Sequence, residues 1–110
     1  MTDTSKTNAS NAKPKGSASQ LQLQAYNLNN GGKYQEALPV AQEAVKKGCK
    51  PNAPVSPCGY ALYELGRAQL ATGDAAGAVA TLNDRLQRYP DDQRAKVEAL
   101  RDKAKQAAGQ

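Results

Sequence analysis

The chain has 110 residues, a formal net charge of +5, and no His, Trp or Phe. This length corresponds to a single domain, and the missing His removes the commonest general base and the commonest metal ligand. We therefore expect a protein that is not an enzyme and that holds no metal or cofactor. Catalysis could rest only on carboxylates such as Glu36, Glu43 and Glu64. Lys and Arg are spread along the chain and no apolar run is long enough to cross a membrane, so neither nucleic-acid binding nor membrane contact is expected.

The N-terminal segment, residues 1–18, contains Ser, Thr, Asn, Lys and Ala but no Leu, Ile or Val. Such a segment buries too little apolar surface to offset the entropy lost on ordering it. We predict a disordered tail or linker here, followed by one domain over residues 19–108.

A first helical hairpin is predicted over residues 19–47. Leu21, Ala25 and Leu28 recur at helical spacing, and residues 29–33 (NNGGK) end this helix because Gly readily adopts the left-handed conformation. A second helix follows at residues 34–47, where an internal Pro is expected to bend it. Its apolar stripe consists of Ala37, Leu38, Ala41, Ala44 and Val45.

Residues 48–58 form a Pro-rich loop that holds both cysteines, Cys49 and Cys58. A structural zinc site needs four ligands, and a redox pair usually has two intervening residues, whereas eight separate these cysteines. The two lie at neighbouring ends of antiparallel helices, so we predict a disulfide between them. A disulfide favours an extracytoplasmic location, while two free thiols in a reducing cytoplasm are the alternative.

A second hairpin is predicted over residues 59–90, with helices at about 57–72 and 75–88 and a turn at TGD (72–74). Its apolar residues are Leu62, Leu65, Ala68 and Leu70 on the first helix, and Ala78, Val79, Leu82 and Leu86 on the second. A C-terminal helix follows in residues 91–108, where DDQ (91–93) is expected to cap its start. Its single apolar stripe consists of Val97, Leu100, Ala104 and Ala107.

The two hairpins align with each other at an offset of 41 residues, which places Gly32 on Gly73 and Ala37 on Ala78. The second hairpin also fits a template of 34 residues: a large apolar residue, Leu-Gly, Ala with an apolar residue four positions later, and Pro. In this chain the template residues are Leu62, Leu65, Gly66, Ala78, Leu82 and Pro90. The pattern resembles the tetratricopeptide repeat (TPR) family. The resemblance implies an all-α fold. The expected architecture is a five-helix right-handed superhelix made of two TPR-like hairpins and a C-terminal capping helix. An unrelated five-helix bundle is the alternative.

Residues 59–93 also resemble the extracytoplasmic TPR-like domain at the C-terminus of some actinobacterial serine/threonine protein kinases. The shared series is Tyr-Ala-Leu, Leu-Gly-Arg, Gly-Asp, Arg-Leu and Asp-Gln. This resemblance implies a bacterial sensor domain on the outer face of the membrane. It also implies that residues 1–18 link the domain to a membrane segment and that the kinase domain lies outside this chain.

Stacked TPR units line a concave groove with their first helices, so residues on that side are candidate ligand contacts. Tyr and Arg are enriched at binding hot spots, and here the candidates, beside Gln22, are Tyr26, Asn29, Tyr60, Tyr63, Arg67, Arg94 and Arg101. We expect a non-catalytic module that binds an extended peptide, a protein or a cell-wall-type polymer. Arg67 is expected to contact an acidic group of this ligand.

Two alternatives stay open for this surface. Tyr60 and Tyr63 can instead cover the joint between the hairpins, because Tyr is commonly half-buried. The domain can also be an adaptor that self-associates through its stacking faces, as a monomer or weak homodimer in solution.

Overall fold

The computed structural model describes residues 13–110, and this part of the chain is helical without any strand. It contains α2 (Ala18–Asn30), α3 (Tyr34–Gly48), α4 (Tyr60–Ala71), α5 (Ala75–Arg88) and α6 (Arg94–Ala107), with a short helical turn, η1 (Val55–Gly59), before α4. The predicted all-α fold is confirmed. The disordered tail was predicted for residues 1–18, of which residues 1–12 lie outside the described part of the chain, while Ser17 and Ala18 already belong to the start of α2.

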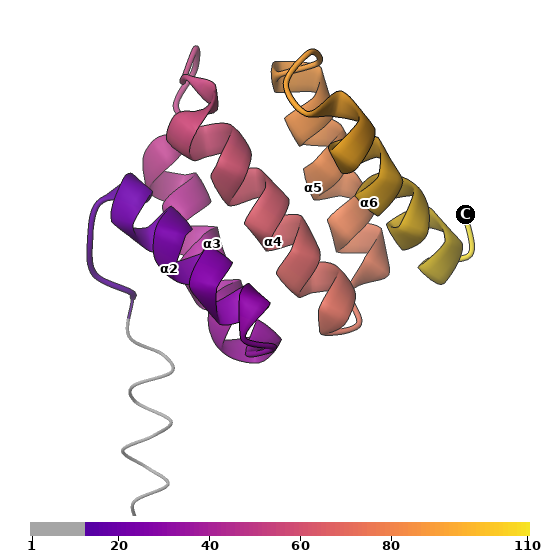
Figure 1. Ribbon diagram of the computed structural model, residues 1–110, viewed down its shortest axis with the longest axis horizontal. Helices are drawn as coiled ribbons and strands as arrows, with labels where there is room; N and C mark the ends of the chain where they lie inside the picture. Colours follow the sequence, from indigo (N-terminus) through magenta and orange to yellow (C-terminus); the bar gives the residue numbers. More distant parts are fainter. Residues whose placement is uncertain (1–12) are drawn as a thin grey trace, which may run out of the picture.

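The helices form two antiparallel hairpins, α2–α3 and α4–α5, and α6 packs against α5. Figure 1 shows α2, α4 and α6 in the near layer and α3 and α5 behind them. The first helix of each hairpin and the C-terminal helix therefore share one face of the molecule.

The start of α2 is set by a capping box at Ser17. Its hydroxyl accepts a hydrogen bond from the Gln20 backbone N–H at 3.1 Å, and the Gln20 side-chain oxygen accepts one from the Ser17 N–H at 2.9 Å. The helix thus begins at Ala18, one residue earlier than predicted. The turns after α2 and α4 contain Gly32 at φ +76° and Gly73 at φ +95°, the left-handed conformation expected of glycine at helix ends.

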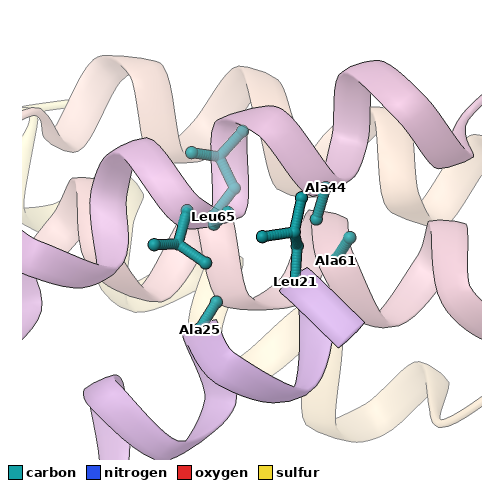
Figure 2. Packing of buried hydrophobic residues seen from close by; sticks show 7 residues of the cluster. Leu21, Ala25, Ala44, Ala61 and Leu65 are labelled. Carbon is teal, nitrogen blue, oxygen red and sulfur yellow. The ribbon is translucent and has the colours of Figure 1, made fainter. Parts of the chain in front are cut away.

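The main core lies where α2, α3 and α4 meet. Figure 2 shows Leu21 and Ala25 of α2 packed against Ala44 of α3 and against Ala61 and Leu65 of α4. Alanines dominate this cluster, which allows the helix axes to approach closely. The core is therefore built from small side chains, as expected for a chain without Phe or Trp.

The crossing of α4 and α5 depends on Gly66. A Cβ at this position would lie 2.7 Å from Leu82 side-chain atoms, far inside van der Waals contact. Ala78 and Val79 of α5 then pack with Ala104 of α6 in a second cluster. The predicted stripe of α6 is wrong at its last member, because Ala107 is exposed.

The predicted cap at the start of α6 is also wrong. Gln93 occupies the N-cap position at φ 50° and makes no side-chain hydrogen bond to the helix. The carboxylate of Asp92 instead accepts a 2.7 Å hydrogen bond from the buried guanidinium of Arg85. A buried cation attracts this carboxylate more strongly than the helix end does.

Cys49 and Cys58 form the predicted disulfide, with their Cα atoms 4.8 Å apart. The bond joins the residue after α3 to η1, which replaces the first turn of the helix predicted from Pro57. The Tyr89 hydroxyl donates a 2.6 Å hydrogen bond to the carbonyl of Ala53 and so ties the enclosed loop to the end of α5. In the part of the chain that the structure describes, no helix has the length and apolar character of a membrane span.

Candidate functional site

A cleft of about 260 Å³ opens on the face shared by α2, α4 and the start of α6. Its lining comes from four helices and the turn before α6, and consists of Gln22, Leu23, Tyr26, Tyr60, Tyr63, Glu64, Arg85, Gln93 and Lys96. The layered arrangement explains this, because residues at helical spacing on α2 and α4 face the same gap. The cleft lies on the side of the molecule where the sequence predicts a groove.

Three tyrosines give the cleft its aromatic character. Tyr26 is 44% exposed, while Tyr60 and Tyr63 are half-buried. Burial raises the pKa of Tyr63 above its ordinary value, with the Glu64 carboxylate adding to the rise and Arg67 opposing it, so this phenol is neutral at physiological pH. Each ring offers apolar area together with a hydroxyl that can donate or accept a hydrogen bond.

Lys96 supplies a positive charge at the cleft. Its Nζ lies 4.9 Å from the centre of the Tyr63 ring, a cation–π contact. Within residues 13–110 no carboxylate forms an ion pair with this ammonium group. The contact holds Lys96 above the aromatic wall while leaving its N–H groups available to an anion.

Glu64 belongs to a buried network between α2 and α4. Glu64 is 4% exposed, and its Oε1 accepts hydrogen bonds from Asn29 Nδ2 at 2.8 Å and from Arg67 Nη1 at 3.0 Å. Asn29 also donates to the Glu64 backbone carbonyl at 3.1 Å, and Arg67 also donates to Asn30 Oδ1 at 3.1 Å. This network joins the two hairpins, and its carboxylate is already neutralised.

Arg85 closes the far wall of the cleft and is only 1% exposed. Its guanidinium donates to the carbonyl of Gly59 at 2.9 Å, to the carbonyl of Tyr89 at 3.3 Å and to the carboxylate of Asp92 at 2.7 Å. It also lies over the Tyr89 ring, 5.4 Å from its centre. The charge of Arg85 is thus matched within the protein.

The structure brings three of the predicted site residues, Tyr26, Tyr60 and Tyr63, into one cleft together with Gln22. Arg67 and the buried Asn29 are instead engaged in the Glu64 network and do not line it. Arg94 pairs with Glu98 at 2.9 Å and Arg101 with Asp102 at 3.0 Å, both away from the lining. The predicted tyrosines thus share one cleft, whereas the predicted arginines do not line it.

Sequence reasoning did not assign five of the lining residues to the groove: Leu23, Glu64, Arg85, Gln93 and Lys96. Lys96 and Arg94 lie on opposite sides of the apolar stripe of α6. The sequence therefore indicates that one of the two faces α4, but it does not indicate which. The signal for Arg85 was its position three residues after Leu82, on the buried side of α5.

The chemistry available at the cleft is that of contact and hydrogen bonding. Across residues 13–110, no three His, Cys, Asp or Glu side chains gather as metal ligands would. The cleft offers aromatic faces, two side-chain amides and an ammonium group. Such an arrangement can hold a flat or aliphatic group next to an anion.

Comparison with known proteins adds no relative: no protein family, no curated protein and no solved structure matches the chain.

Proposed function

We propose that this protein is a non-catalytic binding module of the TPR-like type, whose ligand is anchored in the cleft between α2, α4 and α6. The observation that carries the proposal is the convergence of Tyr26, Tyr60 and Tyr63 from two hairpins on one cleft, beneath the ammonium group of Lys96. Tyrosines give large contact area at a low entropic cost and are frequent in binding surfaces.

The size of the cleft limits what it holds. A volume of about 260 Å³ is smaller than the ~300–1,000 Å³ of pockets that enclose drug-sized molecules. One or two side chains, or one sugar ring, fill such a volume. The ligand is therefore an extended peptide, a protein segment or a cell-wall-type polymer of which only one part enters the cleft.

The charges around the cleft indicate the chemistry of that part. Glu64 has Arg67 as its partner and Arg85 has Asp92, so these groups balance inside the protein. Lys96 has no such carboxylate among residues 13–110. We infer that the ligand carries a carboxylate beside an aromatic or aliphatic group and places it at Lys96, in the role expected of Arg67.

The disulfide bears on where this binding takes place. Structural disulfides persist mainly in oxidising compartments, so the Cys49–Cys58 bond supports a location outside the reducing cytoplasm. Together with the sequence resemblance of residues 59–93, it supports the role of an extracytoplasmic sensor domain for a bacterial membrane serine/threonine kinase. Mass spectrometry of the intact protein, with and without reductant before alkylation, tests the bond directly.

The binding proposal is tested by following backbone amide signals of the oxidised protein during titration with two probes. These are a pooled library of short acidic peptides and a mixture of soluble peptidoglycan fragments. Shifts are expected at Tyr26, Tyr60, Tyr63 and Lys96, but not along the back of α3 or α5.

Matched variants separate the cleft from general surface effects. Tyr63→Ala should weaken binding of the active probe at least tenfold, because one aromatic wall is lost. Tyr34→Ala removes an equally half-buried Tyr at the start of α3, outside the cleft, and should leave binding unchanged. Shifts confined to α3 and α5, or equal losses in both variants, would contradict the proposal.

A further inference from the structure

Glu64 is a carboxylate of the cleft whose hydrogen bonding is incomplete. Its Oε1 atom accepts both of the side-chain hydrogen bonds, from Asn29 and from Arg67. No group in residues 13–110 donates a hydrogen bond to the second oxygen, Oε2. The ion pair with Arg67 therefore balances the charge of Glu64 but leaves one of its two oxygens without a partner, although the residue is only 4% exposed.

The free oxygen of Glu64 opens toward the cleft. Within the described chain, Asn29 Oδ1 is the one enclosed side-chain oxygen or nitrogen that lacks a hydrogen-bond partner. Oε2 is therefore not enclosed, and the hollow that Glu64 lines is the cleft. Figure 1 shows α4, which carries Glu64, between α2 and α6. A largely buried acceptor is costly to leave unpaired, which favours a ligand that donates a hydrogen bond to it.

The surroundings of this oxygen favour a positively charged donor. A hydrogen bond from a cationic N–H group to a carboxylate is about twice as strong as one between neutral groups. Three tyrosines line the same cleft, and aromatic rings attract cations to their faces. The Tyr63 ring already holds one such cation, the ammonium group of Lys96, whose Nζ lies 4.9 Å from the ring centre. A primary ammonium group of the ligand suits both the free oxygen and the aromatic rings.

We propose that the cleft recognises an α-amino-acid group, in which an ammonium group and a carboxylate are attached to the same carbon atom. Glu64 Oε2 accepts a hydrogen bond from the ammonium group, Lys96 pairs with the carboxylate, and the apolar part of the ligand lies on the tyrosine rings. This inference rests on the function proposed above and adds the ammonium group to it. It makes Glu64 a specificity-determining residue, because a ligand with a carboxylate alone leaves Oε2 unpaired.

Three small probes that share a phenylethyl group test the inference. L-phenylalanine carries both charges, 3-phenylpropanoate carries only the carboxylate, and 2-phenylethylamine carries only the ammonium group. The backbone amide signals of Tyr60, Tyr63 and Lys96 are followed while each probe is added to the oxidised protein at neutral pH, up to about 20 mM. Phenylalanine should bind at least about tenfold more tightly than either of the others, because it alone satisfies both Glu64 and Lys96.

Two variants assign each charge of the probe to its partner. Glu64→Gln keeps an acceptor oxygen for Asn29 and Arg67 but removes the negative charge. It should weaken the binding of phenylalanine and 2-phenylethylamine about tenfold and leave 3-phenylpropanoate unchanged. Lys96→Gln should weaken phenylalanine and 3-phenylpropanoate but not 2-phenylethylamine. The matched control is Glu43→Gln, at a half-buried position on α3 outside the cleft, and it should alter the binding of none of the three.

The outcomes separate this inference from the proposed function. If phenylalanine and 3-phenylpropanoate bind the parent protein equally well, the ammonium site is refuted, while the binding of 3-phenylpropanoate still supports the cleft and its cation. This comparison needs no variant, so it holds even if circular dichroism shows that Glu64→Gln disturbs the fold. If none of the probes shifts the signals of the cleft, the inference is overturned, and the proposed function is judged by the titration with peptides and peptidoglycan fragments.

Discussion

The Nε atom of Arg85 donates a 2.9 Å hydrogen bond to the carbonyl oxygen of Gly59, joining α5 to the junction between η1 and α4. Gly59 follows the disulfide-bonded Cys58 and precedes Tyr60 of the cleft. One guanidinium group thus connects the covalent loop, the turn before α6 and the wall of the cleft. The stability of the domain should depend on it strongly.

Replacing Arg85 with Met should lower the free energy of unfolding by about 3 kcal/mol, because the Gly59 carbonyl and the Asp92 carboxylate lose their buried partner. The matched control is Arg88→Met on the same helix. Arg88 pairs with Asp84 at the surface, so its loss should cost no more than about 1 kcal/mol. Urea unfolding followed by circular dichroism measures both, and equal effects would refute the role given to Arg85.

Reducing the Cys49–Cys58 bond should lower the free energy of unfolding by about 2–3 kcal/mol, since the bond closes a loop of about ten residues. The comparison is urea unfolding with and without a dithiol reductant. A variant with Cys49→Ala and Cys58→Ala is the control, and the reductant should not alter it. If reductant leaves the parent protein unchanged as well, the bond contributes no stability.

Gly66→Ala should destabilise the protein by about 1–3 kcal/mol, because its Cβ would overlap the Leu82 side chain at the crossing of α4 and α5. The cost should shrink in a Leu82→Ala background, where the space is free. A double-mutant cycle by chemical denaturation gives this coupling. Additive effects would show that the crossing tolerates a larger residue.

Tyr63 makes stability sensitive to alkaline pH. Its pKa in the folded protein is raised above the ordinary value of 10.0, chiefly by burial. The folded state therefore holds the phenolic proton more tightly than the unfolded state does. The resulting stability is fully present below pH 10 and is lost as the pH rises through the folded pKa.

A spectrophotometric titration of tyrosinate tests this prediction. The difference between the parent protein and Tyr63→Phe isolates one of the five tyrosines. Its midpoint should lie above the ordinary tyrosine value of 10.0. A lower midpoint for Tyr63 would contradict the burial argument.

Much of the fold was predictable because its signals are local. The predicted ends of α3 and α5 lie within one residue of the observed ends, because glycine turns and the spacing of alanines mark them. Gly66 was identified as a template residue of the second hairpin, and the structure places it where α4 and α5 approach closely.

The candidate site was predictable only in part. Tyr26, Tyr60 and Tyr63 were identified because each lies on the side of its helix away from the core stripe. Asn29 was assigned to the same side, yet it is 1% exposed and bonded to Glu64. The burial of a polar residue depends on a partner 35 positions away, which no local pattern reveals.

The sequence by itself determined the helical class, the pairing of the hairpins and the bridge between Cys49 and Cys58, since spacing, glycine and chain connectivity set these locally. Only the tertiary structure decided which charged side chains are buried and paired inside the protein. Arg85 became a buried link because the Gly59 carbonyl, 26 residues away in the chain, meets it together with the nearby Asp92 carboxylate. Lys96 became a cation of the cleft because α6 packs so that its ammonium group lies over the Tyr63 ring of α4. Desolvation costs depend on what surrounds a charge in space, and that is settled only when the helices pack.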